Sequence, residues 1–399
     1  MTYIEAGKAL IKKIEKHGFE AYFVGGVVRD NILGIDINDI DITTSASSEE
    51  IISLFENTDT KGLKYKSVLI HYKGYEFETT TFRIDTNYLD NRHPSVETAV
   101  NLKQDLKRRD FTINALATRD FNKIIDNYDG LKDLENGLIR TIKNPVKSFS
   151  EDSLRILRAI YFSAKLNFKI ENETFLAILE KKDLIFNLSP ARKTSEIAKI
   201  LKLDFASQKR AYFLMNETAI SKILFIDNAV RVLLNSNAHV TDAKIFYSLA
   251  FRDYGYIPND IYQFTKKFTN EVNKIIDLSI ATENGDFNTL LLYNYGEEIC
   301  LYANIVNMIL GKNKDLREEI SDNYKNLPIK KTCDLKFKGQ DVMELCKLDK
   351  VSEISVIVDK VKFAVLNRDL PNDYEILKKY VLNDLKKGDW MWRIVLTVI

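Results

Sequence analysis

The sequence predicts an α+β protein in which the β-structure is confined to the first part of the chain. A short apolar run, Ala21–Val24, breaks at two glycines and continues in a helix-like pattern. Two β-type runs, 65–72 and 75–82, are joined by Lys73-Gly74, which is a typical hairpin signal. From Pro145 onward, apolar residues recur at helical spacing. We therefore expect a small mixed sheet with helices packed on it, followed by an all-helical remainder.

Length and composition indicate a globular protein with more than one domain. The 399 residues, 45% of them hydrophobic, are enough for two or more cores. No apolar run approaches a membrane span, no signal-peptide pattern is present, and the apolar segment 390–399 is too short to span and is expected to pack on a surface. Three widely spaced cysteines suit buried thiols in a reducing compartment rather than disulfides or a zinc site. These features predict a cytoplasmic protein with no membrane partner.

The net charge of +1 conceals an uneven distribution. Residues 140–213 carry fifteen Lys/Arg and eight Asp/Glu, a local net charge of +7, so the rest of the chain sums to −6. A basic segment between acidic flanks is typical of a nucleic-acid-binding surface. A chance accumulation of lysines along solvated helices would give the same numbers.

The remaining early elements follow from apolar spacing and turn residues. Residues 3–17 place apolar side chains at helical spacing, and Gly18 stands where a helix-terminating glycine is common. Residues 48–55 have the pattern of a short helix. Residues 83–94 are polar, rich in turn formers and without periodicity, so we expect a loop there.

The glycine break after residue 24 is the first candidate binding site. Glycines such as Gly26 let backbone N–H groups approach a phosphate, and the N-terminus of the following helix favours negative charge. Arg29 adds a charged donor for the same phosphates. A Gly-Gly pair is more often only a turn, so this signal needs a second one.

The second signal is the pair Asp39 and Asp41. Because they are two residues apart in a predicted strand, both carboxylates emerge on one face, while Ile40 and Ile42 point into a core. Asp-x-Asp alone is usually solvated strand polarity. Two carboxylates beside a phosphate site are what a magnesium-dependent phosphoryl or nucleotidyl transfer requires.

These residues carry a family resemblance. The stretches Val24–Asp30 and Asp39–Thr43 resemble the opening motif of class II tRNA CCA-adding nucleotidyltransferases and their bacterial poly(A) polymerase relatives. Residues 108–117, otherwise readable as a plain helix start, match the second motif through Asn114. Residues 126–134 resemble the third motif, a strand-to-helix turn, with Asn127 where the family usually has proline. The resemblance implies that Asp39 and Asp41 hold Mg²⁺ and that Gly26, Arg29 and Arg109 contact the triphosphate of ATP or CTP.

The same resemblance gives meaning to the polar loop at 83–94. Family members that add adenosine carry a flexible loop at this place, ending in Arg-His-Pro as Arg92-His93-Pro94 does. Members that stop after two cytidines look shortened. The loop therefore implies that this chain completes the final A.

A further motif lies in the helical part. We expect Glu151–Arg158 to open a helix capped by Ser148 or Ser150, with Asp152, Arg155 and Arg158 on one face. Spacing alone favours an exposed ion pair worth little. The resemblance implies instead that these residues bind the base of ATP or CTP. Cytosine and adenine each show an amino donor beside a ring-nitrogen acceptor, so an Asp acceptor and an Arg donor select them over guanine and uracil.

Three other positions enter through the resemblance. Tyr161 stands where the family pattern has another Arg, which removes one expected phosphate or tRNA contact. Glu196 lies at the acidic position of the fifth motif and is expected to support the helix carrying Asp152. Residues 336–342 resemble a Gly-x-Asp turn in the family's C-terminal region.

The prediction is a four-part enzyme. We expect a nucleotidyltransferase head (1–142), a helical neck for base selection (143–205), a helical body (206–327) and a helical tail that binds tRNA (328–399). The implied function is template-independent addition of CCA to the tRNA 3′ end from CTP and ATP, with two Mg²⁺ and release of pyrophosphate. No DNA partner is expected, and the sequence carries no signal for an oligomeric state.

Two kinds of alternative stay open at this point. A poly(A) polymerase or an A-only adding enzyme would keep the same head and loop. A tRNA-binding protein with a vestigial site is a different class, and the intact Asp39, Asp41, Arg109 and Asp152/Arg155 set argues against it.

Overall fold

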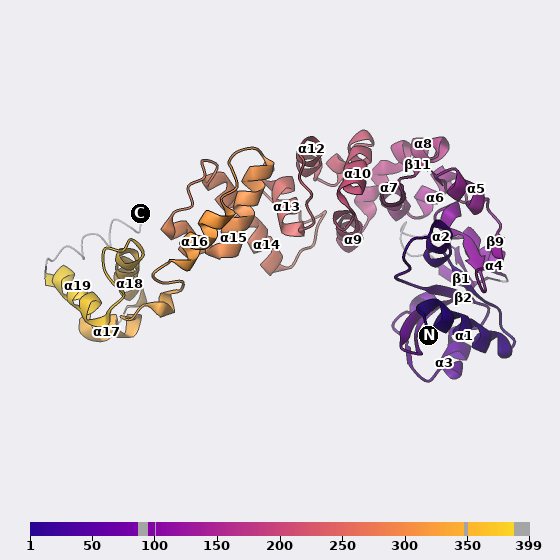
Figure 1. Ribbon diagram of the computed structural model, residues 1–399, viewed down its shortest axis with the longest axis horizontal. Coiled ribbons are helices and arrows are strands. Elements are labelled where there is room, and N and C mark those ends of the chain that lie inside the picture. The colour runs from indigo at the N-terminus through magenta and orange to yellow at the C-terminus, as the bar shows by residue number, and fades with distance from the viewer. Residues whose placement is uncertain (87–94, 100, 347–349, 387–399) are drawn as a thin grey trace. The chain divides into compact units, whose positions relative to one another are not determined.

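The computed structural model describes residues 1–86, 95–99, 101–346 and 350–386 (Figure 1). The chain divides into two compact units, 1–241 with 257–263, and 242–256 with 264–399. Within the described residues all strands belong to the first unit and the second is helical, so the predicted α+β class is confirmed. None of the helices in these ranges is long and apolar enough to cross a membrane.

A seven-stranded mixed sheet forms the centre of the N-terminal region. Its strand order is β3-β4-β5-β2-β1-β8-β9. Strand β2 runs parallel to β5, and the other neighbours are antiparallel. The strands are β1 (Ala21–Val24), β2 (Asp41–Thr44), β3 (Thr58–Asp59), β4 (Ser67–Tyr72), β5 (Tyr75–Thr81), β8 (Leu116–Thr118) and β9 (Ile124–Asp126).

The hairpin expected at Lys73-Gly74 is confirmed. Strands β4 and β5 pair in register up to Tyr72↔Tyr75. Lys73 and Gly74 both have positive φ, 53° and 84°, the conformation that a tight two-residue hairpin turn requires.

Short helices surround this sheet and complete its core. They are α1 (Tyr3–Lys16), α2 (Gly26–Leu33), α3 (Ser48–Leu54), α4 (Leu102–Lys107) and α5 (Gly130–Glu135). Helix α1 ends as predicted, before Gly18 at φ 88°. It packs so closely on the sheet that a Cβ at Gly7 would meet the Phe23 ring at 2.6 Å. Phe23 and Phe77 are both fully buried.

Two segments differ from the sequence prediction in ways that shape the site. Strand β2 begins at Asp41, so Asp39 lies in the preceding segment rather than in the strand, although Ile40 and Ile42 are buried as expected. The segment after Asp110 forms a 3₁₀ turn, Thr112–Asn114, and then β8. It does not form a helix, because β8 pairs with β1 in the sheet.

The loop region at 83–94 is described only in part. Strands β6 (Arg83–Thr86) and β7 (Ser95–Thr98) form an antiparallel pair. The predicted Arg92-His93-Pro94 ending lies outside the described residues, as does the apolar segment 390–399.

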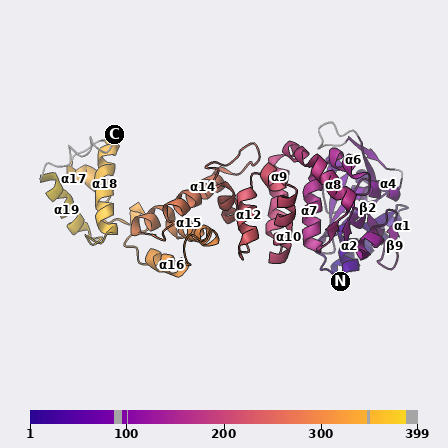
Figure 2. The ribbon, with the colours of Figure 1, turned by 90° about the horizontal axis from the view of Figure 1, so that it is seen from above.

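The rest of the first unit is almost wholly helical. Helices α7, α9 and α10 lie side by side in both ribbon views (Figure 2). A short parallel pair, β10 (Leu138–Ile139) with β11 (Lys169–Ile170), joins the end of the head to these helices. The helices are α6 (Pro145–Glu151), α7 (Leu154–Leu166), α8 (Asn172–Lys181), the 3₁₀ turn Lys182–Asn187, α9 (Pro190–Leu201), α10 (Phe205–Glu217), α11 (Ile220–Ile223) and α12 (Asp227–Asn235).

The predicted helix start at Ser148 or Ser150 is wrong. Both serines lie inside α6, whose cap is Asn144 and whose first position is Pro145. The chain then breaks at Asp152, which has extended backbone angles (φ −145°, ψ 102°), before α7 starts. The Asp152 carboxylate accepts from the Leu154 N–H at 3.1 Å, a local bond that competes with helix continuation.

The second unit packs seven helices of the described residues around its own cores. They are α13 (Ala243–Phe251), α14 (Lys266–Ala281), α15 (Thr289–Ile309), α16 (Arg317–Lys325), α17 (Gly339–Cys346), α18 (Val351–Leu366) and α19 (Tyr374–Lys386). The Gly-x-Asp resemblance falls at the start of α17, where Asp341 accepts from the Lys338 N–H at 2.7 Å. All three cysteines are free; Cys300 is buried as expected, but Cys333 is exposed.

The packing of α5 yields a stability prediction. A Cβ at Gly130 would lie 2.4 Å from the Thr112 carbonyl oxygen, which is backbone and cannot move away cheaply. We expect Gly130→Ala to lower the free energy of unfolding of the N-terminal unit by about 1–3 kcal/mol. Urea denaturation would measure this loss. The control is Gly339→Ala, whose Cβ would make an ordinary contact at 3.5 Å, and equal stability of the two variants would contradict the prediction.

Candidate active site

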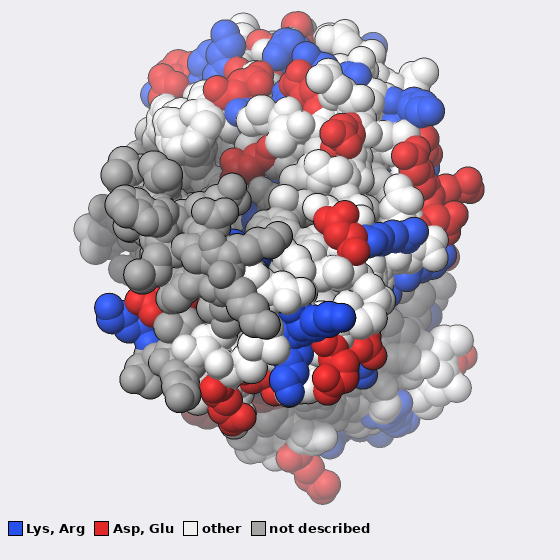
Figure 3. All heavy atoms as spheres, turned by 90° about the vertical axis from the view of Figure 1, so that its left-hand side faces the viewer, with Lys and Arg blue, Asp and Glu red and all other residues white. Residues whose placement is uncertain are grey.

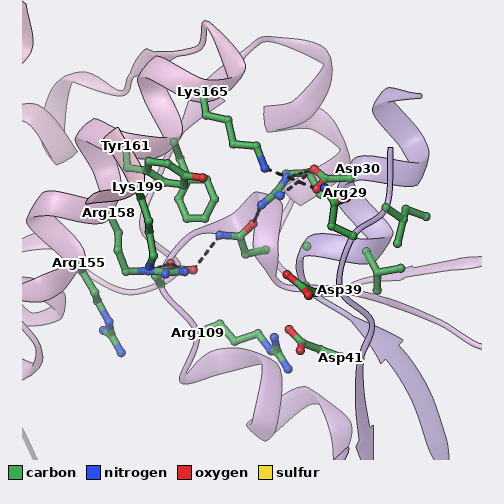
Figure 4. Close-up of a pocket in the computed structure, with 18 of the residues that line it drawn as sticks. Arg29, Asp30, Asp39, Asp41, Arg109, Arg155, Arg158, Tyr161, Lys165 and Lys199 are labelled. Carbon is green, nitrogen blue, oxygen red and sulfur yellow. Dashed lines mark hydrogen bonds and ion pairs between the residues drawn. The ribbon is translucent and has the colours of Figure 1, made fainter. Parts of the chain in front are cut away.

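One pocket of about 520 Å³ collects the candidate residues of the sequence analysis. Its lining comes from the β1–α2 turn, the segment before β2, the segment after α4, the α6–α7 break, and helices α7 and α9 (Figure 4). All eight predicted site residues line it: Gly26, Arg29, Asp39, Asp41, Arg109, Asp152, Arg155 and Arg158. Residues up to 132 positions apart in sequence therefore meet in one place, while their individual roles stay predictions.

The β1–α2 turn has room for nothing larger than glycine. Gly25 adopts φ 74° and ψ −127°, and a Cβ there would lie 2.9 Å from an Arg109 guanidinium nitrogen. Helix α2 begins at Gly26, so its first N–H groups face the pocket without side chains in the way. This turn can accept an anion at close range.

Arg29 is held rigidly one turn into α2. Its side chain is buried, donates to Asn114 Oδ1, and donates from Nε to Asp30 at 2.8 Å. Its guanidinium also lies 5.0 Å from the centre of the Phe162 ring. Arg29 is thus positioned by groups from α2, the 3₁₀ turn and α7.

Asp39 and Asp41 both face the pocket, with Asp41 at the first position of β2 (Figure 4). Surrounding protein raises the pKa of Asp41 by desolvation, Arg109 opposes this, and the carboxylates of Glu78 and Asp39 raise the pKa further. Glu78 is the register partner of Asp41 on β5. Burial and the neighbouring carboxylates disfavour the ionised form of Asp41, and a bound cation would stabilise that form. The cluster therefore has the chemistry of a cation site.

Arg109 is a cation with spare donors. Burial lowers its pKa, and the nearby Asp105 carboxylate counteracts this at a distance of 3.6 Å. Its Nε is buried without a hydrogen-bond partner among the described residues. Asp105 is already engaged more closely by Arg108 at 2.9 Å, so Arg109 is available to a ligand.

Asp110 and Arg158 form the closest ion pair of the pocket. Arg158 approaches an Asp110 oxygen to 2.6 Å, and Asp110 also accepts from Asn114 Nδ2 at 3.0 Å and from the Phe111 N–H at 2.8 Å. Burial alone would raise the pKa of Asp110, but Arg158 and these hydrogen bonds outweigh it and the pKa is lowered. The pair joins the segment after α4 to helix α7.

Asp152 and Arg155 do not form the ion pair that their spacing suggested. Asp152 lies in the break between α6 and α7, and both of its oxygens accept from Arg192 of α9 at 2.9 Å. Arg155 donates to Ser148 Oγ and to the Arg108 carbonyl, both at 2.8 Å. The two side chains line the same pocket but are oriented by different partners, so the prediction of one helix face is wrong for Asp152.

Comparison with known proteins decides the family. Residues 21–140 match the poly A polymerase head domain, 167–227 match a probable RNA- and SrmB-binding site of polymerase A, and 261–381 match a putative tRNA nucleotidyltransferase domain 2. The CCA-adding enzyme of Ligilactobacillus salivarius is 36% identical over 92% of this chain and 93% of its own, and that of Bacillus licheniformis is 33% identical over 93% and 96%. The chain belongs to the CCA-adding enzyme family. It is therefore an enzyme, a tRNA nucleotidyltransferase.

Solved structures of this family agree with the fold. The Bacillus stearothermophilus CCA-adding enzyme in complex with CTP superposes with a TM-score of 0.84 over 98% of this chain and 99% of that one, at 28% identity. The Thermotoga maritima CCA-adding enzyme in complex with tRNA, at 22% identity and a TM-score of 0.62, supports the fold alone.

For a CCA-adding enzyme, several pocket residues escaped the sequence analysis. They are Asp30, Arg83, Arg108, Asp110, Asn114, Lys165 and Lys199. Asp110 and Asn114 lie inside the matched second motif, so the motif itself was the available signal. Tyr161 lines the pocket, so the departure from the family's Arg falls within the site.

Helix α9 contributes to this site through a different residue than expected. Glu196 is buried and pairs with Lys199 at 2.6 Å, and its field acts on Arg158 of α7. The direct support of Asp152 comes from Arg192 instead. Within the fifth motif, Arg192 therefore supports Asp152, whereas Glu196 acts on Arg158.

The Asp110–Arg158 pair gives a pH-dependent prediction. Arg158→Met removes the ion-pair partner of the buried Asp110, and we expect a loss of about 3 kcal/mol in the free energy of unfolding at pH 7. The lowered pKa of Asp110 stabilises the wild type above about pH 4 and ceases to do so as the pH falls through that lowered pKa. In the variant burial raises the pKa, so the deficit should shrink between pH 7 and about pH 4. Urea denaturation across this range, with the exposed-cation control Lys12→Met, would measure it; a deficit independent of pH would contradict the assignment.

Proposed function

We propose that this chain adds CCA to the 3′ end of tRNA from CTP and ATP, without a nucleic-acid template, and releases pyrophosphate. The observation that carries the proposal is the junction of a carboxylate pair, a glycine turn at a helix N-terminus and base-edge donors and acceptors in one pocket. Relatives named CCA-adding enzymes, and the solved structure of such an enzyme in complex with CTP, support it.

The residues fit a divalent metal, and we propose Mg²⁺ held by Asp39 and Asp41. No group of three or more Asp, Glu, His or Cys that could hold a metal occurs within the described ranges, so phosphate oxygens and water would complete the coordination. When bound, two such ions would lower the pKa of the terminal ribose hydroxyl and offset charge on the departing pyrophosphate. The protein's part is to keep both carboxylates on one side of the pocket, with the Arg109 guanidinium beside Asp41 (Figure 4).

The triphosphate would lie against the α2 N-terminus and the Arg109 guanidinium, which is next to the β1–α2 turn. The backbone N–H groups at Gly26 can be approached closely by a phosphate, because glycine has no side chain. The positive charge of Arg29, held by Asp30, attracts the anion to this side of the pocket. Arg109 contributes the terminal nitrogens of its guanidinium, one of which lies at the Gly25 turn. This arrangement orients the α-phosphate toward Asp39 and Asp41, which is a positioning contribution to the rate.

Base selection would fall to Asp152 and Arg155, with Arg158 close by. Asp152 accepts from the amino group of cytosine or adenine, and Arg155 donates to the neighbouring ring nitrogen. Arg192 fixes the Asp152 carboxylate and Ser148 fixes the Arg155 guanidinium. Because both readers are held by other protein groups, the pocket can reject guanine and uracil without a template strand.

The tRNA would be bound mainly by shape and phosphate charge. The basic segment 140–213 supplies most of that charge, and the resemblance places further contacts in a C-terminal tail from residue 328. On the face seen in Figure 3, blue and red side chains are interspersed and neither sign forms a continuous patch among the coloured residues. The mixture of charges on this face favours recognition of the RNA body by its shape over recognition by phosphate charge. The proposal includes the division into head, neck, body and tail, with boundaries after residues 142, 205 and 327. It also includes a cytoplasmic location for the enzyme.

The deciding experiment separates these activities by product length. A tRNA transcript that ends before CCA is incubated with Mg²⁺ and CTP, ATP or both, and the products are sized. Addition of two nucleotides with CTP and three with both supports the proposal. Long A tails would indicate a poly(A) polymerase, addition only of A to a CC end an A-adding enzyme, and no product a tRNA-binding protein.

The same assay tests the carboxylate pair. We expect Asp39→Asn or Asp41→Asn to reduce incorporation of both nucleotides at least about a hundredfold, because loss of a metal ligand removes several kcal/mol of transition-state stabilisation. tRNA binding, measured by filter retention, should be unchanged. A folded variant that keeps near-normal incorporation would contradict the metal assignment.

Base selection gives a separate prediction. Asp152→Ala removes the acceptor and leaves Arg155 beside the base, where uracil and guanine present acceptor oxygens. Losing one hydrogen bond to a charged group costs about 1.5–3 kcal/mol, so discrimination against UTP and GTP should fall roughly ten- to a hundredfold. Competition of UTP with CTP measures the ratio. An unchanged ratio, with only a small change in melting temperature, would make Asp152 a structural ion-pair partner of Arg192.

A further inference from the structure

The pocket carries more positive charge than the proposed contacts use. Among its described lining residues are eight Lys or Arg and five Asp, a net charge of +3. Several of these cations are already paired at short range, for example Arg158 with Asp110 at 2.6 Å and Lys199 with Glu196 at 2.6 Å. Lys165 of α7 differs, because its ammonium lies 3.9 Å from the nearest Asp30 oxygen, the longest ion pair described for the pocket.

Asp30 cannot neutralise Lys165, because it is already engaged. Arg29 holds Asp30 Oδ1 from two nitrogens, Nε at 2.8 Å and a terminal nitrogen at 2.7 Å. The Lys165 ammonium faces the other oxygen, Oδ2, next to the Arg29 guanidinium (Figure 4). One carboxylate shared by two cations leaves this corner of the pocket with a residual positive charge.

Lys165 is also free to move toward a ligand. Its side chain is 31% exposed, and an ammonium on a four-carbon stem changes position at low cost. Tyr161 lies one turn earlier on the same face of α7, with its ring 5.3 Å from that of Phe162. No described residue hydrogen-bonds the Tyr161 hydroxyl, although it lines the pocket. A cation and a hydroxyl from one helix face are therefore available together.

The position of this pair within the pocket identifies the ligand group. Lys165 lies on the side of Arg29 and the α2 N-terminus, whereas Arg155 lies at the opposite side (Figure 4). An anion that rests on the α2 N-terminus is within reach of Lys165, but a base read by Asp152 and Arg155 is not. A compact, hydrated ammonium suits phosphate oxygens as a point charge.

We propose that Lys165 is a further triphosphate ligand, whose ammonium moves away from Asp30 and binds the terminal phosphates of CTP and ATP. The Tyr161 hydroxyl donates a hydrogen bond to the same anion. This inference rests on the proposed function, since it assigns a residue to the nucleotide of that reaction. It predicts that Lys165 contributes to affinity for the phosphates and not to the choice between C and A.

The test compares nucleotides that differ only in their phosphates. In the full-length enzyme, we expect Lys165→Gln to raise the KM for CTP and for ATP by about tenfold each, with kcat changed less than twofold. Displacement of bound fluorescent CTP by pyrophosphate should weaken about tenfold, and displacement by CMP less than twofold. Lys12→Gln, the same change at an exposed lysine of α1 that lies outside both the pocket lining and the basic segment 140–213, is the control and should leave all of these values unaltered.

A relocated charge separates binding from a structural role. The double variant Tyr161→Arg/Lys165→Gln has a cation one turn earlier on the same face of α7. Compared with Lys165→Gln alone, it should bind CTP and pyrophosphate at least about threefold more tightly. The proposal is overturned if Lys165→Gln leaves CTP and pyrophosphate binding unchanged, or weakens CMP equally with CTP. The proposed function is tested on the wild-type enzyme alone. It would be overturned if the wild type neither binds CTP nor extends tRNA, whatever the Lys165 variants do.

Discussion

The buried Asp110 carboxylate is the interaction on which the site depends. It accepts from Arg158 of α7, from Asn114 of the 3₁₀ turn and from its neighbouring backbone N–H. Asn114 in turn accepts from Arg29 of α2, and the Phe162 ring lies 5.0 Å from the guanidinium of both Arg29 and Arg158. One carboxylate therefore fixes α2, the helix of the proposed phosphate site, relative to α7, the helix that carries Arg155.

A second link connects the two functions of the pocket through the backbone. Arg155 donates to the carbonyl of Arg108, the residue directly before Arg109. The proposed base reader and the proposed triphosphate ligand are thus tied to the same short segment. The same segment is also fixed by ion pairs of Arg108 with Asp105 and of Asp110 with Arg158.

Local patterns were sufficient for most of the fold, whereas several candidate site residues, Arg109 and Asp152 among them, were predicted only through the family resemblance. The Gly-Gly break, the buried Ile40 and Ile42 beside Asp41, and the Lys73-Gly74 turn are decided by neighbours in sequence, and they were predicted from it. Partners from distant segments were not accessible. Nothing near Asp152 in sequence indicates that Arg192, forty residues later, would hold it.

The errors have a common physical origin, which is competition between local and tertiary bonds. Spacing placed Asp152 on a helix face with Arg155, but its carboxylate bonds the Leu154 N–H and ends α6 instead. The segment after Asp110 had an apolar pattern compatible with a helix, yet pairing with β1 makes it a strand. Each of these two segments contributes a residue to the pocket lining, Asp152 in the first and Asn114 in the second.

The division of the chain has a practical consequence for fragments. The N-terminal unit does not end where its continuous sequence does, since it takes back residues 257–263, and the Tyr262 hydroxyl donates to the Leu224 carbonyl at 2.8 Å. Tyr262 is fully buried. A fragment cut after residue 241 would lose this side chain from its core. A truncated enzyme meant to fold by itself should therefore extend through residue 263 and bridge 242–256 with a designed linker.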